Sequence, residues 1–274
     1  MTTCNESNPN AIKPKTHTPK AIFFDLDGTL LSNGKLIESA KKALLYAKEK
    51  GVMLFIATGR HKIEVDIMPW LPCVSFDGFV TMNGAYSYIG DEVVHTRTIA
   101  KDTVTAVAEY LTKTQQYGLF CEANNMYASI LDERAIAFQA QLGLKIPPVR
   151  DPRHAVNADI YQIVVFGEEI KGLLQRLSKC EITSWADNCY DIVPAGINKW
   201  VGILPMLAKF GLDPKDVATI GDGPNDIEML MGAGYSVAMG NGPDNVKAHA
   251  DYITRNVEDD GILEAIEHLL GCEI

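Results

Sequence analysis

The chain has 274 residues, 47% of them hydrophobic and 22% charged, so it is long enough to bury a substantial core as one large or two moderate domains. Its formal net charge of −10 disfavours a nucleic-acid backbone or an anionic membrane surface as the main partner. No apolar run approaches the roughly 20 residues that a membrane span needs, and the composition predicts a soluble, cytoplasmic protein.

Residues 1–19 are polar, rich in Thr, Asn, Lys and Pro, and lack the apolar region of a signal peptide. We expect them to form a flexible tail. The six cysteines occur without a Cys-x-x-Cys pair or a nearby histidine cluster. This spacing predicts reduced, mostly buried thiols rather than disulfides or a metal site.

The first apolar run, which begins at Ala21, ends in two carboxylates, Asp25 and Asp27, spaced i and i+2. Such a run is typical of a strand buried on both faces, and i, i+2 side chains leave a strand in the same direction. Carboxylates about 4 Å apart repel by roughly 4 kcal/mol at an effective dielectric near 20 unless a cation or a shared proton intervenes. The pair therefore indicates a metal-assisted acid site. The alternative is that both acids are only turn and helix-cap residues.

The pattern from residue 20 to residue 84 predicts strand, helix, strand, helix, strand. Residues 35–50 are amphipathic, and Gly51 is placed to end that helix. The next apolar run, 52–57, leads into Thr58-Gly59-Arg60, where a hydroxyl and backbone N–H groups at a helix start suit a phosphate. We expect the adjacent His61 to be an exposed loop histidine.

From residue 85 the pattern changes to alternation around turns. Residues 86–89 and 92–95 predict one hairpin, and 119–121 with 126–130 predict another around Asn124-Asn125. Helical patterns are interspersed over 103–116, 133–142 and 168–177. Together they predict an α+β insert over residues 85–192.

The first pattern resumes at residue 193. Lys199 is placed on the first turn of a helix, and the apolar run 217–220 leads into a loop with Asp222, Asn225 and Asp226. Ligands of an open α/β sheet bind beyond the carboxyl ends of its strands. We therefore expect the four polar loops of the chain to meet at one edge of a sheet.

Four motifs in this order resemble those of the haloacid dehalogenase-like hydrolase superfamily, and within it the Cof-type phosphatases, which carry a large inserted cap of the C2 type. The motifs are Asp25-Leu26-Asp27-Gly28-Thr29, Thr58-Gly59-Arg60, Lys199 and Gly221-Asp222-Gly223-Pro224-Asn225-Asp226. The similarity extends to residues 81–85 and 239–242. It implies an α/β fold, with a Rossmann-like doubly wound parallel sheet as catalytic core (20–84 and 193–274) and an inserted α+β cap domain (85–192).

The resemblance also implies an activity, the Mg²⁺-dependent hydrolysis of a small phosphorylated metabolite through an aspartyl phosphate. Sugar phosphates, nucleotides and cofactor phosphates such as pyridoxal or flavin phosphates are all admissible. Asp25 would be the nucleophile, and Asp27 would protonate the departing alcohol and later accept a proton from water. Asp25 and Asp222 would bind Mg²⁺ through their side chains and Asp27 through its backbone carbonyl, since this ion prefers oxygen ligands.

Further residues receive roles by the same resemblance. The phosphate would be bound by the backbone N–H groups of Leu26 and Gly59, the Thr58 hydroxyl, the Lys199 ammonium and the Asn225 amide. Thr29 would hold Asp27 in place, and Asp226 would orient a metal-bound water or Lys199. We expect Arg60 and Asn83 to contact the substrate. Trp200, where Cof-type chains commonly have glycine, and Pro205, which we expect to interrupt the helix after Lys199, depart from the family pattern.

Two other functions remain open from the sequence. A phosphomutase would keep the aspartyl phosphate but return the group to a sugar. A non-catalytic phospho-acceptor signalling module would need Asp25 but no acid at Asp27, and it leaves the large insert unexplained. The sequence defines neither the metabolite nor the oligomeric state.

Overall fold

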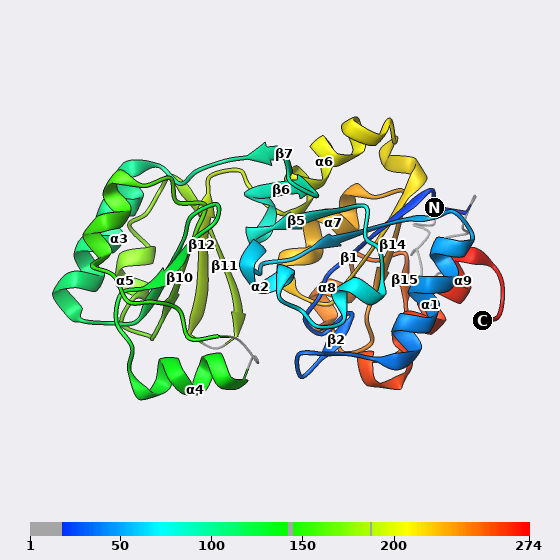
Figure 1. Cartoon of the computed structure of the whole chain (residues 1–274), viewed down its shortest axis with the longest axis horizontal. Coiled ribbons are helices and arrows are strands. Elements are labelled where there is room, and N and C mark those ends of the chain that lie inside the picture. The colour runs from blue at the N-terminus through cyan, green and yellow to red at the C-terminus, as the bar shows by residue number, and fades with distance from the viewer. Residues whose placement is uncertain (1–17, 142–144, 187) are drawn as a thin grey trace, which may run out of the picture.

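The computed structural model describes residues 18–141, 145–186 and 188–274. Two sheets lie side by side, one with eight strands and one with five, and each has its own helices (Figure 1). The predicted tail lies outside the described residues except for its last two positions, and Cys4 lies outside them too. In the described ranges, no helix is both long enough and apolar enough to cross a membrane.

The eight-stranded sheet has the strand order β15-β14-β13-β1-β4-β5-β6-β7. Neighbours from β15 to β5 are parallel, and the β5-β6 and β6-β7 pairs are antiparallel. The strands are β1 (Ala21–Phe24), β4 (Met53–Ala57), β5 (Gly78–Thr81), β6 (Tyr86–Ile89), β7 (Glu92–Thr96), β13 (Val217–Gly221), β14 (Tyr235–Ala238) and β15 (Tyr252–Ile253). The predicted strand, helix, strand, helix, strand order of residues 20–84 is confirmed.

Helices cover both faces of this sheet. They are α1 (Glu38–Glu49), α2 (Lys62–Asp66), α6 (Lys199–Phe210), α7 (Ile227–Gly232), α8 (Asp244–Lys247) and α9 (Gly261–Leu270). On the central strand β1, Ile22 and Phe24 belong to the apolar cluster with α1 and α9, whereas Ala21 and Phe23 belong to the cluster with α6 and α7. Burial on both faces explains why β1 has an unbroken apolar sequence.

Single turns of 3-10 helix join several of these elements. They are η1 (Leu71–Cys73), η2 (Met82–Gly84), η3 (Pro152–Asn157), η4 (Pro214–Asp216), η5 (Pro224–Asp226) and η6 (Val257–Asp259). Of these, η2 directly follows β5, and η5 follows β13 after two residues, so they shape two of the polar loops.

The helix expected from residue 35 begins only at Glu38. The residues before it form a small hairpin, β2 (Leu31–Ser32) with β3 (Lys35–Leu36). Its turn residues Asn33 and Gly34 have φ values of 50° and 73°. Asn-Gly is favoured in such a turn because both of its central positions need positive φ, so the sequence contained a local hairpin signal that outweighs the helical period.

The insert has an antiparallel five-stranded sheet of order β11-β12-β10-β8-β9. Its elements are α3 (Lys101–Thr114), β8 (Gly118–Cys121), β9 (Met126–Ala128), α4 (Glu133–Gln141), β10 (Gln162–Phe166), α5 (Lys171–Leu174), β11 (Cys180–Ala186) and β12 (Cys189–Pro194). The predicted β8-β9 hairpin is confirmed, and α5 is shorter than expected. All of the described cysteines are free, but only Cys121 is buried. The prediction that most of the thiols are buried was therefore wrong.

The first hairpin of the predicted insert belongs to the other sheet. Strands β6 and β7 extend the eight-stranded sheet beyond β5, and Tyr88 stacks on Phe79 of β5 at 5.0 Å between ring centroids. The alternation of residues 86–95 predicted a hairpin but not the sheet that it joins. We therefore propose that the insert begins after β7, near residue 97, rather than at residue 85.

Gly84 brings the loop after β5 into close contact with the start of α6. Its φ is +95°, and a Cβ atom at this position would lie 2.1 Å from the backbone oxygen of Asn198. Gly202 on α6 faces it, since a Cβ there would lie 2.6 Å from Gly84 Cα. Two glycines at this crossing let the first turn of α6, which carries Lys199, approach the sheet edge.

We predict that Gly84→Ala lowers the free energy of unfolding by at least about 2 kcal/mol more than Gly51→Ala. Both glycines have positive φ, so both variants carry backbone strain, but Gly51 has no atom within 4 Å of the added methyl group. Urea unfolding of the two variants measures the difference. Equal losses would mean that the contact between Gly84 and Asn198 does not constrain the fold.

Candidate active site

The four polar loops meet at the carboxyl-terminal edge of the eight-stranded sheet. Asp25 follows β1, Thr58 follows β4 and Asp222 follows β13, and these strands are neighbours because β1 pairs with both of the others. Lys199 begins α6, whose N-cap Asn198 accepts a hydrogen bond from the Val201 N–H. The convergence expected from the sequence is present.

Lys199 is buried between two carboxylates. Its Nζ donates to Asp25 Oδ1 and Asp226 Oδ1, each at 2.6 Å, and its exposed fraction is 0%. Burial alone would lower the pKa of Lys199, but the charges of Asp226 and Asp25 outweigh it and raise the pKa. Burial raises the pKa of Asp25 well above its ordinary value, and Lys199 opposes that shift. The lysine is thus held charged by the carboxylates that it joins.

Both carboxylate oxygens of Asp226 accept hydrogen bonds. Its Oδ2 accepts the backbone N–H groups of Asp222 and Gly223 at 2.9 and 2.8 Å, while Oδ1 accepts Lys199. These bonds fix the loop after β13 and set the position of Lys199.

Asp222 is held by donors on both of its oxygens. Thr29 Oγ1 donates to Oδ1 at 2.9 Å, and Asn241 Nδ2 donates to Oδ2 at 3.1 Å. Gly28 is required here, because a Cβ atom would lie 2.2 Å from Asp222 Oδ2. Burial, followed by the charge of Asp226, raises the pKa of Asp222 to about 7. Asn241 had received no role from the sequence, although its loop follows β14 at the same sheet edge.

The acidic cluster fits a divalent cation. Ligand oxygens of Asp25, Asp222 and Asp226 lie within 4.8 Å of one another. Asp25 Oδ2 and the Asp27 carbonyl oxygen accept no hydrogen bond from any described residue. Asp25, Asp27 and Asp222 therefore offer only oxygen donors, which suit a hard cation such as Mg²⁺.

Two backbone N–H groups without an acceptor in the described ranges lie in the loops after β1 and β4, beside the acidic cluster. Among the residues that the structure describes, the N–H groups of Leu26 and Gly59 find no acceptor. The Thr58 hydroxyl accepts the Arg60 N–H at 3.1 Å and keeps its own proton available. Unpaired N–H groups in tight loops at strand ends form sites for oxyanions.

Asp27 is paired with Arg60. The guanidinium donates from Nε and Nη2 to Oδ2 and Oδ1, both at 2.6 Å. The Asp27 side chain is 48% exposed, whereas the Arg60 side chain is only 10% exposed, so Asp27 reaches solvent while its bidentate partner is largely buried. The substrate contact expected of Arg60 stays a prediction.

A second set of polar contacts joins this edge to the insert. Asn83, which is buried and has a φ of 53°, donates to Gln162 Oε1 at 3.1 Å and Asp191 Oδ2 at 2.8 Å, and it accepts from Asn225 Nδ2 at 2.9 Å. Gln162 Nε2 donates to the Gly59 carbonyl at 3.0 Å. Asn83 and Asn225 thus make protein contacts here, and their expected contacts with substrate and phosphate stay predictions.

The expectation that His61 is an exposed loop residue was wrong. It is 1% exposed and caps α2, where its Nδ1 accepts the Ile63 N–H at 3.1 Å and Glu64 Oε2 accepts the His61 N–H at 2.9 Å. Its Nε2 lies 2.6 Å from the Glu122 carbonyl oxygen of the insert. Burial lowers its pKa. His61 and Glu64 form a capping box, but the sequence signature of that motif begins with Ser or Thr, so a histidine at this position gave no such signal.

Neither departure from the family pattern displaces Lys199. The Trp200 ring lies against Gly232 of α7, where a Cβ atom would be 2.2 Å from it, so it points away from the acids. Helix α6 continues through Pro205, and the expected interruption is absent. Since a proline removes the hydrogen bond to the residue four positions earlier, the loss falls after Lys199.

A cavity of about 230 Å³ lies between the sheet edge and the insert. Its volume is just below the range of about 300–1,000 Å³ typical of ligand pockets, so it suits a small ligand. Residues from both parts line it, among them Asp25, Asp27, Thr58, Arg60 and Asp222 from the sheet edge and Leu119, Met126, Gln139 and Val164 from the insert. One space thus joins the acids to the insert.

Comparison with known proteins gives this geometry a context. Residues 22–266 match the family model described as haloacid dehalogenase-like hydrolase. Pyridoxal phosphate phosphatase YbhA of Escherichia coli is 30% identical, with 92% of this chain and 100% of that protein covered. The 5-amino-6-(5-phospho-D-ribitylamino)uracil phosphatase YcsE of Bacillus subtilis is 29% identical, with 91% and 95% covered.

A solved structure agrees over the same length. The subclass IIB sugar phosphatase BT4131 superimposes with a TM-score of 0.84 at 35% identity, covering 91% of this chain and 98% of that one. The similarity therefore includes the insert as well as the eight-stranded sheet.

We predict that Lys199→Met lowers the free energy of unfolding by about 3–5 kcal/mol, because Asp25 and Asp226 remain as buried carboxylates without a cation. Lys209 on the same helix is the matched control, since it pairs with Glu92 at 2.6 Å on the surface. Lys209→Met should cost at most about 1 kcal/mol. Urea unfolding compares the two, and a small loss for both would contradict the central place given to Lys199.

Proposed function

Because this chain belongs to the haloacid dehalogenase-like hydrolases, we propose that it is a Mg²⁺-dependent phosphatase that works through a phosphoryl intermediate on Asp25. The chain is a phosphatase of small phosphorylated substrates, as its relatives are. This favours hydrolysis over the phosphomutase and signalling alternatives. The observation that carries the mechanism is that Asp25, bonded to the Lys199 ammonium, lines a cavity beside the unpaired N–H groups of Leu26 and Gly59.

In the first step, a carboxylate oxygen of Asp25 attacks phosphorus, and the bond from phosphorus to the alcohol oxygen breaks. The Leu26 and Gly59 N–H groups and the Lys199 ammonium stabilise the charge on the phosphoryl oxygens. Lys199 uses two N–H groups on carboxylates, and its third would donate to a phosphoryl oxygen. Asp27 keeps one oxygen on Arg60, takes a proton from solvent on the other, and gives that proton to the departing alcohol.

In the second step, water attacks the phosphorus of the Asp25 phosphate and gives its proton to Asp27. The bond between phosphorus and the Asp25 oxygen breaks, so inorganic phosphate leaves and Asp25 is regenerated. Asp27 suits this double role because its side chain is half exposed and can exchange a proton with water.

Asp25 and Asp222 would hold Mg²⁺ through their side chains and Asp27 through its backbone carbonyl. When bound, the ion supplies positive charge that offsets the repulsion among the carboxylates and the phosphate. Thr29 and Asn241 keep Asp222 in place for this, and Asp226 keeps Lys199 in place.

The insert would cover the site and select the leaving group. Gln162, Asp191 and the Glu122 carbonyl already contact the sheet edge through Asn83, Gly59 and His61. We therefore extend the expectation of a cap to the insert as the structure has it, beginning near residue 97.

We predict that Asp25→Asn reduces phosphate release by at least about a thousand-fold while the protein stays folded, since it removes the nucleophile at almost constant volume. The control is Asp244→Asn on the exposed first turn of α8, which should keep wild-type activity. Phosphate release from p-nitrophenyl phosphate is measured without any bisphosphate activator. Substantial turnover by pure Asp25→Asn protein would exclude the covalent route.

Chelation should abolish activity, and Mg²⁺ should restore it. The physical reason is that the acids around Asp25 repel one another and a phosphate unless a cation is present. The measurement is phosphate release after dialysis against EDTA and again after titration with Mg²⁺. Full activity in metal-free protein would rule out the metal site as assigned.

A further inference from the structure

The part of the cavity formed by the insert differs in chemistry from the part formed by the sheet edge. Leu119 and Val164 stand opposite each other on β8 and β10, and Met126 lies beside them on β9. These three give the insert side an apolar wall. If the phosphoryl group binds at Asp25, as proposed above, the leaving group extends toward this wall.

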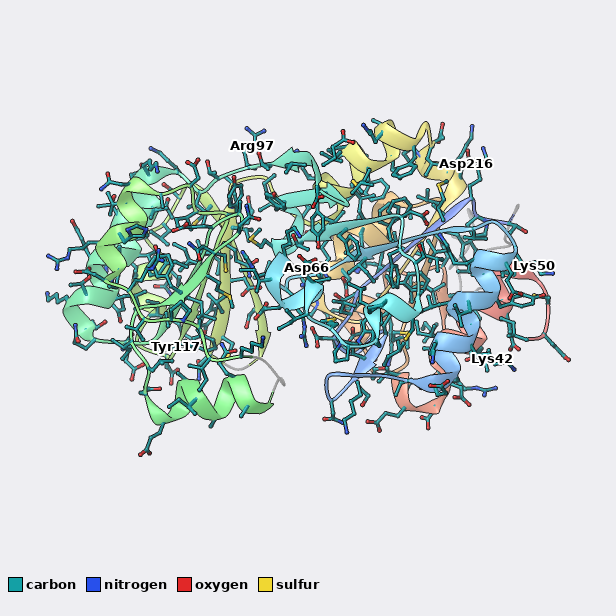
Figure 2. All side chains as sticks on the ribbon, in the orientation of Figure 1. Lys42, Lys50, Asp66, Arg97, Tyr117 and Asp216 are labelled. Carbon is teal, nitrogen blue, oxygen red and sulfur yellow. The ribbon has the colours of Figure 1, made fainter. Side chains whose placement is uncertain are left out.

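Gln139 of α4 lines the same space and has one unsatisfied atom. The residue is 0% exposed, and its Nε2 donates to the Tyr117 hydroxyl at 2.9 Å. Tyr117 lies in the insert beside α4 (Figure 2). The Gln139 Oε1 atom is buried and accepts no hydrogen bond from any described residue. Buried acceptors without a donor are rare and costly, so this atom points to a donor supplied by a ligand.

The charged side chains that line the cavity are mostly acidic. Beyond the acids at the strand ends, Glu64 and Asp191 also line the cavity. Among the described lining residues, Arg60 is the one permanent cation, and its charge is paired with the Asp27 carboxylate through Nε and Nη2. His61 accepts at Nδ1 from a backbone N–H, so its ring is neutral. A second negative group on the leaving group would therefore face carboxylates without a free cation.

We propose that the insert side of the cavity selects leaving groups that carry no second anionic group and that donate a hydrogen bond to Oε1 of Gln139. Uncharged polyols and amino alcohols have this chemistry, whereas carboxylated alcohols and bisphosphates do not. The proposal rests on the proposed function, because it places the phosphoryl group at Asp25. It goes further, since it assigns leaving-group recognition to one side chain and one charge pattern.

The charge preference is tested with two matched pairs of esters. Glycerol 1-phosphate is compared with 3-phosphoglycerate, and glucose 6-phosphate with 6-phosphogluconate. We expect kcat/KM to be at least about ten-fold higher for the neutral member of a pair. Hydrolysis of p-nitrophenyl phosphate without such a preference in either pair would overturn this proposal and leave the phosphatase function standing. No hydrolysis of any ester would instead contradict the proposed function.

The role of Gln139 is tested with Gln139→Leu, and with Gln175→Leu as an exposed control in the insert. We expect Gln139→Leu to lower kcat/KM for the neutral polyol esters by about ten-fold and to change it little for p-nitrophenyl phosphate, whose leaving group has no donor. Gln139→Glu keeps an acceptor oxygen and should retain the polyol esters better, which covers the case in which the leucine variant fails to fold. A parallel loss for both kinds of ester in either variant would show a purely structural role.

Discussion

The arrangement of the site depends on one buried cation between two carboxylates. Lys199 is fully buried, so its charge is tolerated only because Asp25 and Asp226 each accept it at 2.6 Å. Three separate segments of the chain must therefore meet, namely the end of β1, the start of α6 and the loop after β13. The close approach of Gly84 to Asn198 allows this meeting, because a side chain there would displace the first turn of α6. The packing of the eight-stranded sheet and the arrangement of the charged groups at its edge therefore depend on the same contacts of Lys199.

The insert is joined to this site by hydrogen bonds of amide side chains. Asn225, in the loop that Asp226 fixes, donates to Asn83, and Asn83 donates to Asp191 and Gln162 of the insert. Asn83 is held with positive φ, a strained backbone that persists only where the surroundings determine it. A shift of the insert would therefore change the hydrogen bond of Asn225, which lies next to the proposed phosphoryl site. We infer that binding of a leaving group to the insert would affect the chemistry at Asp25 through these hydrogen bonds.

Much of the sheet edge was predictable because polar residues directly follow apolar strands there. Asp25, Thr58 and Asp222 follow neighbouring parallel strands, and Asn198 marks the start of α6, so local patterns placed four loops together. Local alternation also predicted the β6-β7 hairpin. It could not predict which sheet the hairpin joins, because that depends on which sheet has a free edge beside it in the folded chain. The contacts of His61 and Gln139 were missed because each joins residues that are far apart in the sequence. His61 lies against the Glu122 carbonyl of the insert, and Gln139 donates to the Tyr117 hydroxyl within the insert.

The most direct test of the proposed chemistry is to look for the phosphoryl group on Asp25. The Asp27→Asn variant is mixed with p-nitrophenyl phosphate and Mg²⁺, quenched in acid and analysed by peptide mass spectrometry. Because p-nitrophenolate leaves without a proton, the first step should proceed, whereas the second lacks its base and the intermediate should accumulate. The mechanism predicts one phosphoryl group on the peptide that contains Asp25. A burst of p-nitrophenol with Asp25 unmodified, or with the group on another residue, would contradict it.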